Sequence, residues 1–420
     1  MYRRPVILFL LLAAGAAAQT EPSSEALLNR IRQKVGQNLA GLPNYTCTQT
    51  IERAERHVSK RDFAPLDTLR LEIAYVGGKE LVAWPGASKF EEKRIEDVVA
   101  RAGAIGNGSF ALHVYNVFRT KSPVFSTPVE EEREGRRLFR GNFQVDRVKS
   151  SWSVGNGAKS AIVGYHGTFW VNAETLDLVR LELQADNIPP QIGISSDSET
   201  VEYGRIRIGE SDFLLPLFSE MSMVDRVGTA SRNRTRFTSC RQYTGESVIS
   251  FADPASLPET AQALEVLRLP AGEWIEVNLT AAIDARKVAI GDPVSATVRQ
   301  DLRKGAGVLI PKGAVLSGRI TRMDKREAAF GAFYIAGIQF ISIAAGNGRA
   351  DFLGALEEAG FGGNQYFVPF ASDPGRGLSI WSHLQGTMAA PLPGEGILLA
   401  KESKSPFPAG LRMRWRILPR

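Results

Sequence analysis

The alternation of apolar and polar positions divides the chain into a helical start and two successive series of strands. Apolar side chains recur every three or four residues from Leu28 to Leu39, which predicts an amphipathic helix. Ser23 and Ser24 can cap its first turn, and Gly41 and the proline that follows end it. From residue 45 the period changes to two, with threonine at every second position, which favours a strand.

Tight turns join the strands of the first series. Gly77-Gly78 lies between the alternating segments 69–75 and 81–85 and predicts a hairpin. Turns at 172–175 and 209–211 join two further pairs, 168–171 with 178–183 and 201–208 with 213–224. Residues 95–118 interrupt the series with short stretches of helical spacing. Strands that follow one another through tight turns form an antiparallel sheet rather than a βαβ sheet.

The second series is entirely of strands. Short β segments separated by Gly, Pro and Asp predict a small barrel or sandwich in residues 271–420, with a long Gly-, Pro- and Ser-rich loop at about 357–395. The fold class is therefore mainly β, with an α+β first half. The expected boundaries are a signal peptide at 1–18, a first domain at 23–252, a linker at 253–270 and the second domain at 271–420.

The first 18 residues predict export. Arg3 and Arg4 form a positive start, a short aliphatic run follows, and Ala16-Ala17-Ala18 matches a signal-peptide cleavage site. The apolar run is too short for an ordinary membrane span, and no later segment reaches about 18 consecutive apolar residues. We therefore expect a periplasmic or extracellular protein with no transmembrane span after cleavage.

Charge and cysteine content narrow the function classes. The chain carries 51 Lys+Arg against 45 Asp+Glu, a net charge of +6 spread without a block, so a nucleic-acid partner is not expected. Cys47 and Cys240 are the only cysteines. In an oxidising compartment two thiols favour a disulfide over two free thiols. Such a bond would place the strands around them side by side.

Residues 23–252 resemble the lipoprotein-carrier (LolA/LolB type) fold. The likeness lies in the first helix running into Tyr45-Thr46-Cys47-Thr48, the hairpin of 167–171 and 175–181, and the closing Arg236-Phe237 and Arg241-Gln242-Tyr243. In that family a strongly curved, incomplete sheet wraps helices and holds acyl chains on its concave side. The resemblance implies helices on the concave side of the sheet and a lipid or acylated ligand.

The second half resembles the barrel domain of conjugation and type IV secretion channel proteins (TrbI type). Ala282-Ile283-Asp284, Gly291-Asp292-Pro293-Val294 and the segment 308–318 carry the likeness. In those channels the barrel is an assembly module, which implies envelope proteins as partners.

Motifs for catalysis and metal binding are missing from the sequence. The four histidines, His57, His113, His166 and His383, form no cluster with cysteine or with one another, so we expect no metal and no cofactor. No G-x-S-x-G motif is present, and 155–160 has the wrong spacing for a phosphate loop. We therefore expect no enzymatic activity.

Large aromatic side chains offer a different function. Seven of them lie on elements that should converge under a curved sheet and could line an acyl-chain site: Trp84, Phe110, Tyr115, Phe118, Phe143, Trp170 and Phe213. The alternative is that they fill a dry core. Arg232, Arg234 and Arg236 share one strand face and either meet an anionic partner or form a solvated surface.

The leading hypothesis is an exported, non-enzymatic envelope protein that binds or carries something apolar in its first domain and contacts partners through its second. A purely structural envelope scaffold is the alternative. An unrecognised hydrolase is a third hypothesis, which a cleft with convergent titratable groups would favour.

Overall fold

The computed structural model describes residues 24–76, 79–87, 90, 104–106, 109–155, 159–243, 265–266, 269–305, 307–328, 331–362, 364–366, 368, 391–403 and 406–419. The predicted signal peptide and most of the predicted linker lie outside these residues, as do most of the helical stretch at 95–108 and His383. None of the described helices is long and apolar enough to span a membrane.

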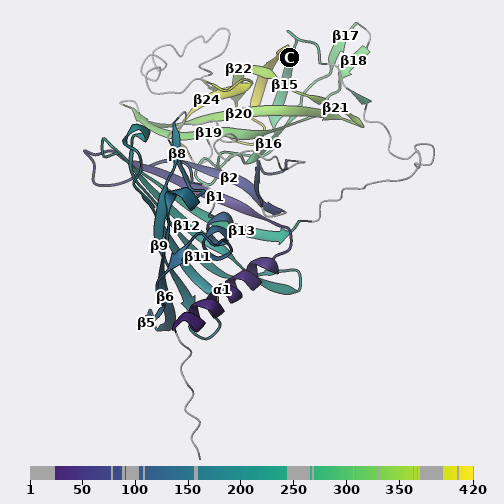
Figure 1. The fold of residues 1–420 in the computed structure, drawn as a ribbon. Coiled ribbons are helices and arrows are strands. Elements are labelled where there is room, and N and C mark those ends of the chain that lie inside the picture. The colour runs from purple at the N-terminus through teal and green to yellow at the C-terminus, as the bar shows by residue number, and fades with distance from the viewer. Residues whose placement is uncertain are drawn as a thin grey trace, which may run out of the picture.

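The mainly β fold class is confirmed, and the first half is a curled antiparallel sheet (Figure 1). Its order is β3-β2-β1-β13-β12-β11-β10-β9-β6-β4, and β5 pairs with β6. The strands are β1 (Tyr45–Arg56), β2 (Ala64–Val76), β3 (Lys79–Ala83), β4 (Val124–Phe125), β5 (Val129–Arg133), β6 (Arg136–Val145), β9 (Gly164–Asn172), β10 (Leu178–Asp186), β11 (Ile194–Ile208), β12 (Ser211–Asp225) and β13 (Ala230–Gln242). The three predicted hairpins are therefore confirmed.

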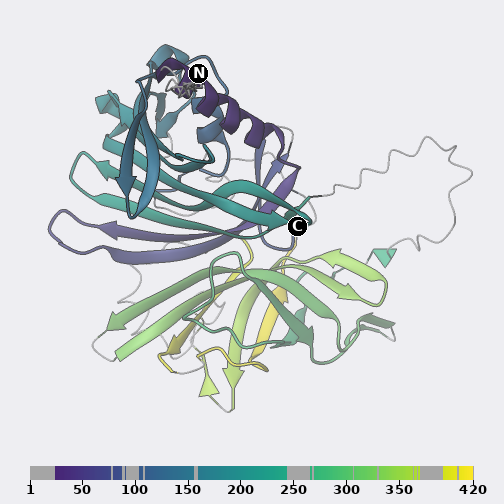
Figure 2. The same cartoon turned by 90° about the horizontal axis from the view of Figure 1, so that it is seen from below.

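Two helices lie on the concave side of this sheet (Figures 1 and 2). The predicted first helix is α1 (Ser24–Ala40), which buries Ile31 and Val35. The second is the short α3 (Leu112–Phe118). Smaller elements complete this half: the 3-10 turns η1 (Arg147–Lys149) and η2 (Pro190–Ile192), and a separate pair of strands, β7 (Ser153–Gly155) and β8 (Ser160–Ile162).

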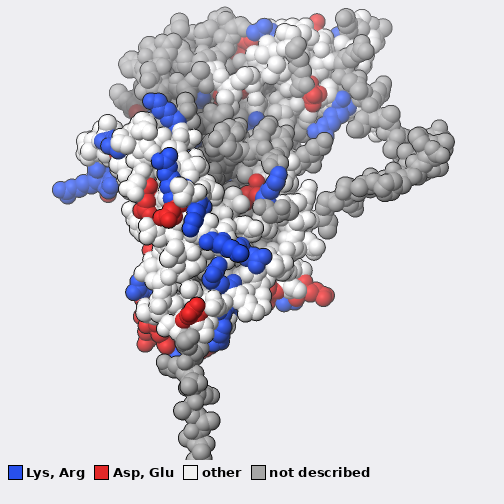
Figure 3. Space-filling model, in the orientation of Figure 1, with Lys and Arg blue, Asp and Glu red and all other residues white. Residues whose placement is uncertain are grey.

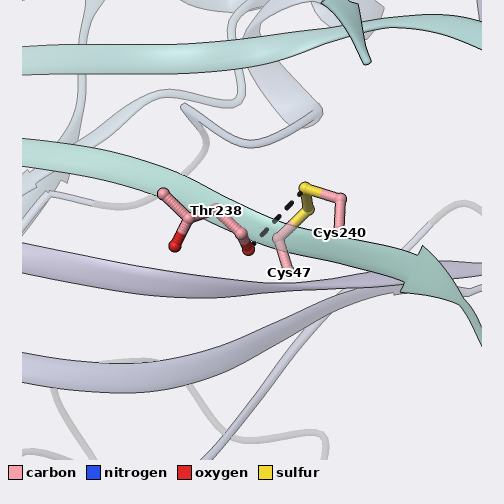
Figure 4. The surroundings of a disulfide bond; sticks show 3 residues. All are labelled: Cys47, Thr238 and Cys240. Carbon is pink, nitrogen blue, oxygen red and sulfur yellow. Dashed lines mark hydrogen bonds between the residues drawn. A yellow bond between two sulfur atoms is a disulfide. The ribbon is translucent and has the colours of Figure 1, made fainter. Parts of the chain in front are cut away.

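The predicted disulfide between Cys47 and Cys240 is confirmed (Figure 4). It joins β1 to β13, the first and last strands of the domain, which pair antiparallel. Thr46 lies opposite Arg241 and Thr48 opposite Thr238, so two residues of β13 face the single Cys47. This local bulge brings the two cysteine Cα atoms within 4.1 Å of each other.

The second half is another β unit, with one ten-stranded sheet in the order β14-β21-β20-β19-β16-β15-β25-β22-β23 and with β24 paired to β20. Its strands are β14 (Glu265–Val266), β15 (Trp274–Leu279), β16 (Pro293–Val298), β19 (Val315–Ala328), β20 (Gly331–Ala345), β21 (Gly348–Asp351), β22 (Gly354–Phe361), β23 (Asn364–Gln365), β24 (Glu395–Lys401) and β25 (Arg412–Ile417); β17 (Leu302–Lys304) and β18 (Gly307–Ile310) form a separate pair. The sheet surrounds one core that includes Phe340, Phe407 and Trp415. Because β22 ends at Phe361, the first residues of the predicted loop form a strand.

The two halves are docked against each other along the edge of β2 (Figure 2). The strand β3 covers β2 only from Glu72 onward, which leaves the preceding residues of that edge open. Ile290 fills the gap: its carbonyl accepts from the Arg70 amide at 2.7 Å and its own amide donates to Thr68 at 2.8 Å. The Ile290 side chain is buried in the core of the first domain, and Asp292 forms an ion pair with Arg70.

Candidate functional site

The register of the sheet aligns inward side chains in rows across the concave face. One row is apolar apart from a threonine and a serine; it consists of Ile51, Thr235, Ser219, Val201, Leu181 and Phe169. The next row is more polar; it consists of Arg53, Asn233, Met221, Glu199, Leu183 and Gly167. The face is therefore mostly apolar with a polar region near its middle.

The helix α3 rests on this polar region through a buried ion pair. The Nε2 atom of His113 lies 2.8 Å from a carboxylate oxygen of Glu199 on β11, and both side chains are buried. Burial by itself would lower the pKa of His113, but the charge and hydrogen bond of Glu199, together with the charges of Glu80 and Asp197, outweigh it, so the pKa is raised. The pair therefore favours the protonated form of the His113 imidazole.

A second buried carboxyl group lies two residues earlier on the same face of β11. Burial raises the pKa of Asp197 to about 7, with a further rise from Glu199 and a partial offset from His113. A carboxylic acid that titrates near neutral pH can hold or release a proton under physiological conditions. The Asp197 carboxyl, next to His113 and Glu199, is therefore the group of this region whose pKa lies near 7.

A carboxylate also fixes the start of α3. Glu80 of β3 accepts hydrogen bonds from the backbone amides of Ala111 at 2.6 Å and Leu112 at 2.9 Å. The residue at the cap position, Ala111, has no side chain that could accept such a bond. Glu80 takes that role from another element and ties α3 to the edge of the sheet.

Three buried side-chain oxygens next to this region have no hydrogen-bond partner among the described residues. They are the hydroxyls of Tyr45 and Tyr203 and the Oε1 atom of Gln49. Burial is the main cause of the strongly raised pKa of both tyrosines, and the carboxylate of Glu80 raises both further. Buried polar atoms nearly always have a partner in native proteins, so these three oxygens are exceptions.

The seven aromatic residues predicted to line a ligand site occupy several different environments. Phe118 and Phe143 belong to the cluster under α1 and α3, where Phe118 meets Phe169 edge-on at 5.4 Å. Phe110 is buried in the neighbouring cluster, and Phe213 packs at that cluster's margin. These four lie in two of the core clusters of the first domain.

The other three predicted residues lie elsewhere. Trp170 lies on the opposite face from Phe169, where its indole nitrogen donates to Glu131 at 2.7 Å. The ring of Trp84 is at the domain boundary, with Arg319 over it at 5.1 Å, and Tyr115 is 43% exposed.

The structure also places the other described histidines and the three arginines of β13 named in the sequence analysis. His57 is exposed, and His166 pairs with Asp186 at the surface. The described residues contain no group of side chains that could hold a metal ion. Arg234 and Arg236 are exposed and Arg232 half-buried, all on the face of β13 opposite to the inward-facing Asn233.

His113 belongs to no sequence motif, and neither Asp197 nor Glu199 stands out in the sequence. The predicted strand began at residue 201, whereas β11 begins at Ile194. Extending the alternation backward from Val201 would have placed both acidic residues on the inward face, and that placement was the available signal.

Comparisons with known proteins add little to this description. No protein-family model and no curated protein matches the chain. The crystal structure of a DUF1329 family protein from Desulfovibrio piger is similar over 54% of this chain and 98% of its own, with 11% identity and a TM-score of 0.31. A likeness of this size carries no functional argument, so the resemblances to lipoprotein carriers and channel barrels stay predictions.

Proposed function

We propose that the protein is an exported, non-enzymatic envelope protein whose first domain binds an amphipathic ligand, such as a lipid or an acylated molecule, on the concave face of its sheet. The second domain serves as the module that contacts envelope partners. The observation that carries the proposal is the set of buried, unpartnered oxygens of Tyr45, Gln49 and Tyr203 on a face that is mostly apolar.

The polar part of the ligand would bind to these oxygens. The two hydroxyls can donate or accept, and the Gln49 oxygen accepts. A buried polar group without a partner costs about 1–3 kcal/mol, and a hydrogen-bonding guest removes that cost. Water would satisfy the same atoms, so the experiment has to separate water from a larger guest.

The apolar part of the ligand would lie along the neighbouring rows of aliphatic and aromatic side chains. Each CH₂ group removed from water contributes about 0.8 kcal/mol, so a chain of ten carbons gains roughly 8 kcal/mol before ordering costs. The His113–Glu199 pair and Glu80 hold α3 across this face. In this proposal their role is to position the helix, and no reaction is assigned to them.

The test is native mass spectrometry of the full chain together with solvent extraction, followed by titration with a fluorescent fatty acid. We expect a bound apolar molecule or saturable uptake of the probe. Tyr203→Phe should weaken uptake about two- to tenfold, the range for one hydrogen bond, without lowering stability. Tyr115→Phe, which alters an exposed tyrosine on α3, is the matched control and should leave uptake unchanged.

Failure of both measurements would refute the proposal. A chain that carries no extractable molecule and takes up no probe, while remaining folded, would instead favour the structural scaffold. Equal uptake by the Tyr203→Phe variant would show that the polar group binds elsewhere.

A further inference from the structure

A second site lies at the boundary of the two domains, away from the concave face. A cleft of about 690 Å³ opens between β1, β2 and β13 of the first domain and the loop 285–288 and strands β19 and β20 of the second. This volume is in the range of small-molecule sites and far exceeds that of a single ion. Because both domains contribute walls, the cleft exists only while they are docked.

Basic residues from both domains line this cleft: Arg53, whose side chain itself faces the concave side, and Arg232, Arg234, Arg286, Lys325 and Arg326. Three of them have carboxylate partners. Arg53 pairs with Asp67, Arg234 with Glu220 and Lys325 with Glu402.

The other three arginines, Arg232, Arg286 and Arg326, form no ion pair with any described residue. Three acidic residues also line the cleft. Asp67 is paired with Arg53, and Asp324 has an interaction partner of its own. Glu52 lies directly across from Arg234 in the β1–β13 register. Arg234 is already paired with Glu220, and Arg286 also interacts electrostatically with Glu402, but three arginines against Glu52 leave the cleft with an excess of positive charge. Basic side chains also mark the left edge of the molecule in Figure 3, where the β1–β2 hairpin ends.

The cleft also has apolar walls. The guanidinium of Arg232 lies 4.2 Å from the ring centre of Phe63, which holds it in place at the cleft. Tyr334 of β20 and Leu66 of β2 contribute further apolar surface from opposite domains. A ligand that satisfies all these groups carries an anionic group next to an organic part.

We propose that the cleft binds a phosphate ester, with Arg232 of the first domain and Arg286 and Arg326 of the second around the phosphate group. Guanidinium groups match the oxygens of a phosphate in paired hydrogen bonds, and several of them suit a doubly charged group better than a single carboxylate. The organic part lies against Phe63 and Tyr334. A lipid headgroup and a soluble phosphate ester share this chemistry.

The test uses the full chain in calorimetric titrations with glycerol 3-phosphate, inorganic phosphate and succinate, and in sedimentation with phosphatidylcholine vesicles that contain phosphatidic acid. We expect saturable binding of glycerol 3-phosphate that is tighter than that of succinate. Arg286→Gln and Arg326→Gln should each weaken it about tenfold, as expected for the loss of a charged hydrogen bond. Both residues are exposed, so the variants should fold normally.

Arg136→Gln is the matched control, because Arg136 is an exposed arginine of β6 outside the cleft, and it should leave binding unchanged. If glycerol 3-phosphate binds and the arginine variants weaken it, the ligand is a soluble phosphate ester. If only vesicles bind and the arginine variants weaken that binding, the ligand is a lipid headgroup. Either result supports the site. Binding that is absent in both formats, equal for succinate, or insensitive to the Arg286 and Arg326 variants would overturn the proposal.

Discussion

Substituting Gly291 by alanine should weaken the contact between the two domains. Gly291 has a backbone φ of +102° at the point where the second domain meets the edge of β2. A Cβ atom there would overlap the carbonyl oxygen of Arg70 and come within 2.6 Å of the Trp84 ring. Both are fixed parts of the interface, so the loop carrying Ile290 has to move away.

The expected cost follows from what that movement breaks. The positive φ costs a non-glycine residue about 1 kcal/mol. Two backbone hydrogen bonds, between Ile290 and residues 68 and 70, contribute about 1 kcal/mol each. Partial exposure of the Ile290 side chain adds about 1–2 kcal/mol. The docking of the domains should weaken by about 4–5 kcal/mol in Gly291→Ala.

The control is Gly272→Ala, because Gly272 also has a positive φ, +89°, but no atom lies within 4 Å of the position of its Cβ. Urea denaturation should show a loss of about 1 kcal/mol for the control and a clearly larger loss, or an earlier separate transition, for Gly291→Ala. Hydrogen exchange at the Arg70 amide should accelerate only in the latter. Equal stability of the two variants with unchanged exchange at Arg70 would refute the reasoning.

Three further predictions concern the first domain. The pKa of Asp197 is raised to about 7, so between about pH 4 and 7 the folded state binds a proton that the unfolded state lacks, and the free energy of unfolding falls as pH rises through that window. Asp197→Asn should remove on the order of 4 kcal/mol of this fall in the free energy of unfolding. The measurement is the difference between the denaturation midpoints of the two proteins across pH. Replacing both Cys47 and Cys240 with serine should lower the free energy of unfolding by about 2–5 kcal/mol, and an unchanged midpoint in urea would contradict the stabilising role of the bond. Glu80→Gln should cost about 1 kcal/mol and speed amide exchange at Leu112, while exchange in α1 should not change.

Much of the first domain could be predicted because its signals are local. Turns such as Gly77-Gly78 and the alternation around them define hairpins, and neighbouring hairpins form a meander. The pairing of β1 with β13 is not local, and only the two cysteines indicated it. In the second domain the strands could be predicted for the same reason, but the order of the sheet could not, because nothing in the sequence indicates which distant strands pair.

The candidate site was harder to predict, because burial does not follow from residue type. Phe169 and Trp170 are adjacent and both apolar, yet only Phe169 faces the helices, since β5 provides Glu131 and Arg133 as partners for Trp170 on the other face. Trp84 could be recognised as a large ring but not as part of a domain boundary. That boundary depends on Ile290, a single side chain in a segment with no distinctive pattern.

Because β1 pairs with β13, the sheet of the first domain cannot be completed until residue 242 has left the ribosome. Until then β1 pairs only with β2. The amide and carbonyl groups along its other edge are unpaired and can form hydrogen bonds with other strands. Assembly thus ends with the closure of a very long loop, a slow step that calls for protection of the nascent chain. Oxidation of the two thiols then secures the last strand in its place.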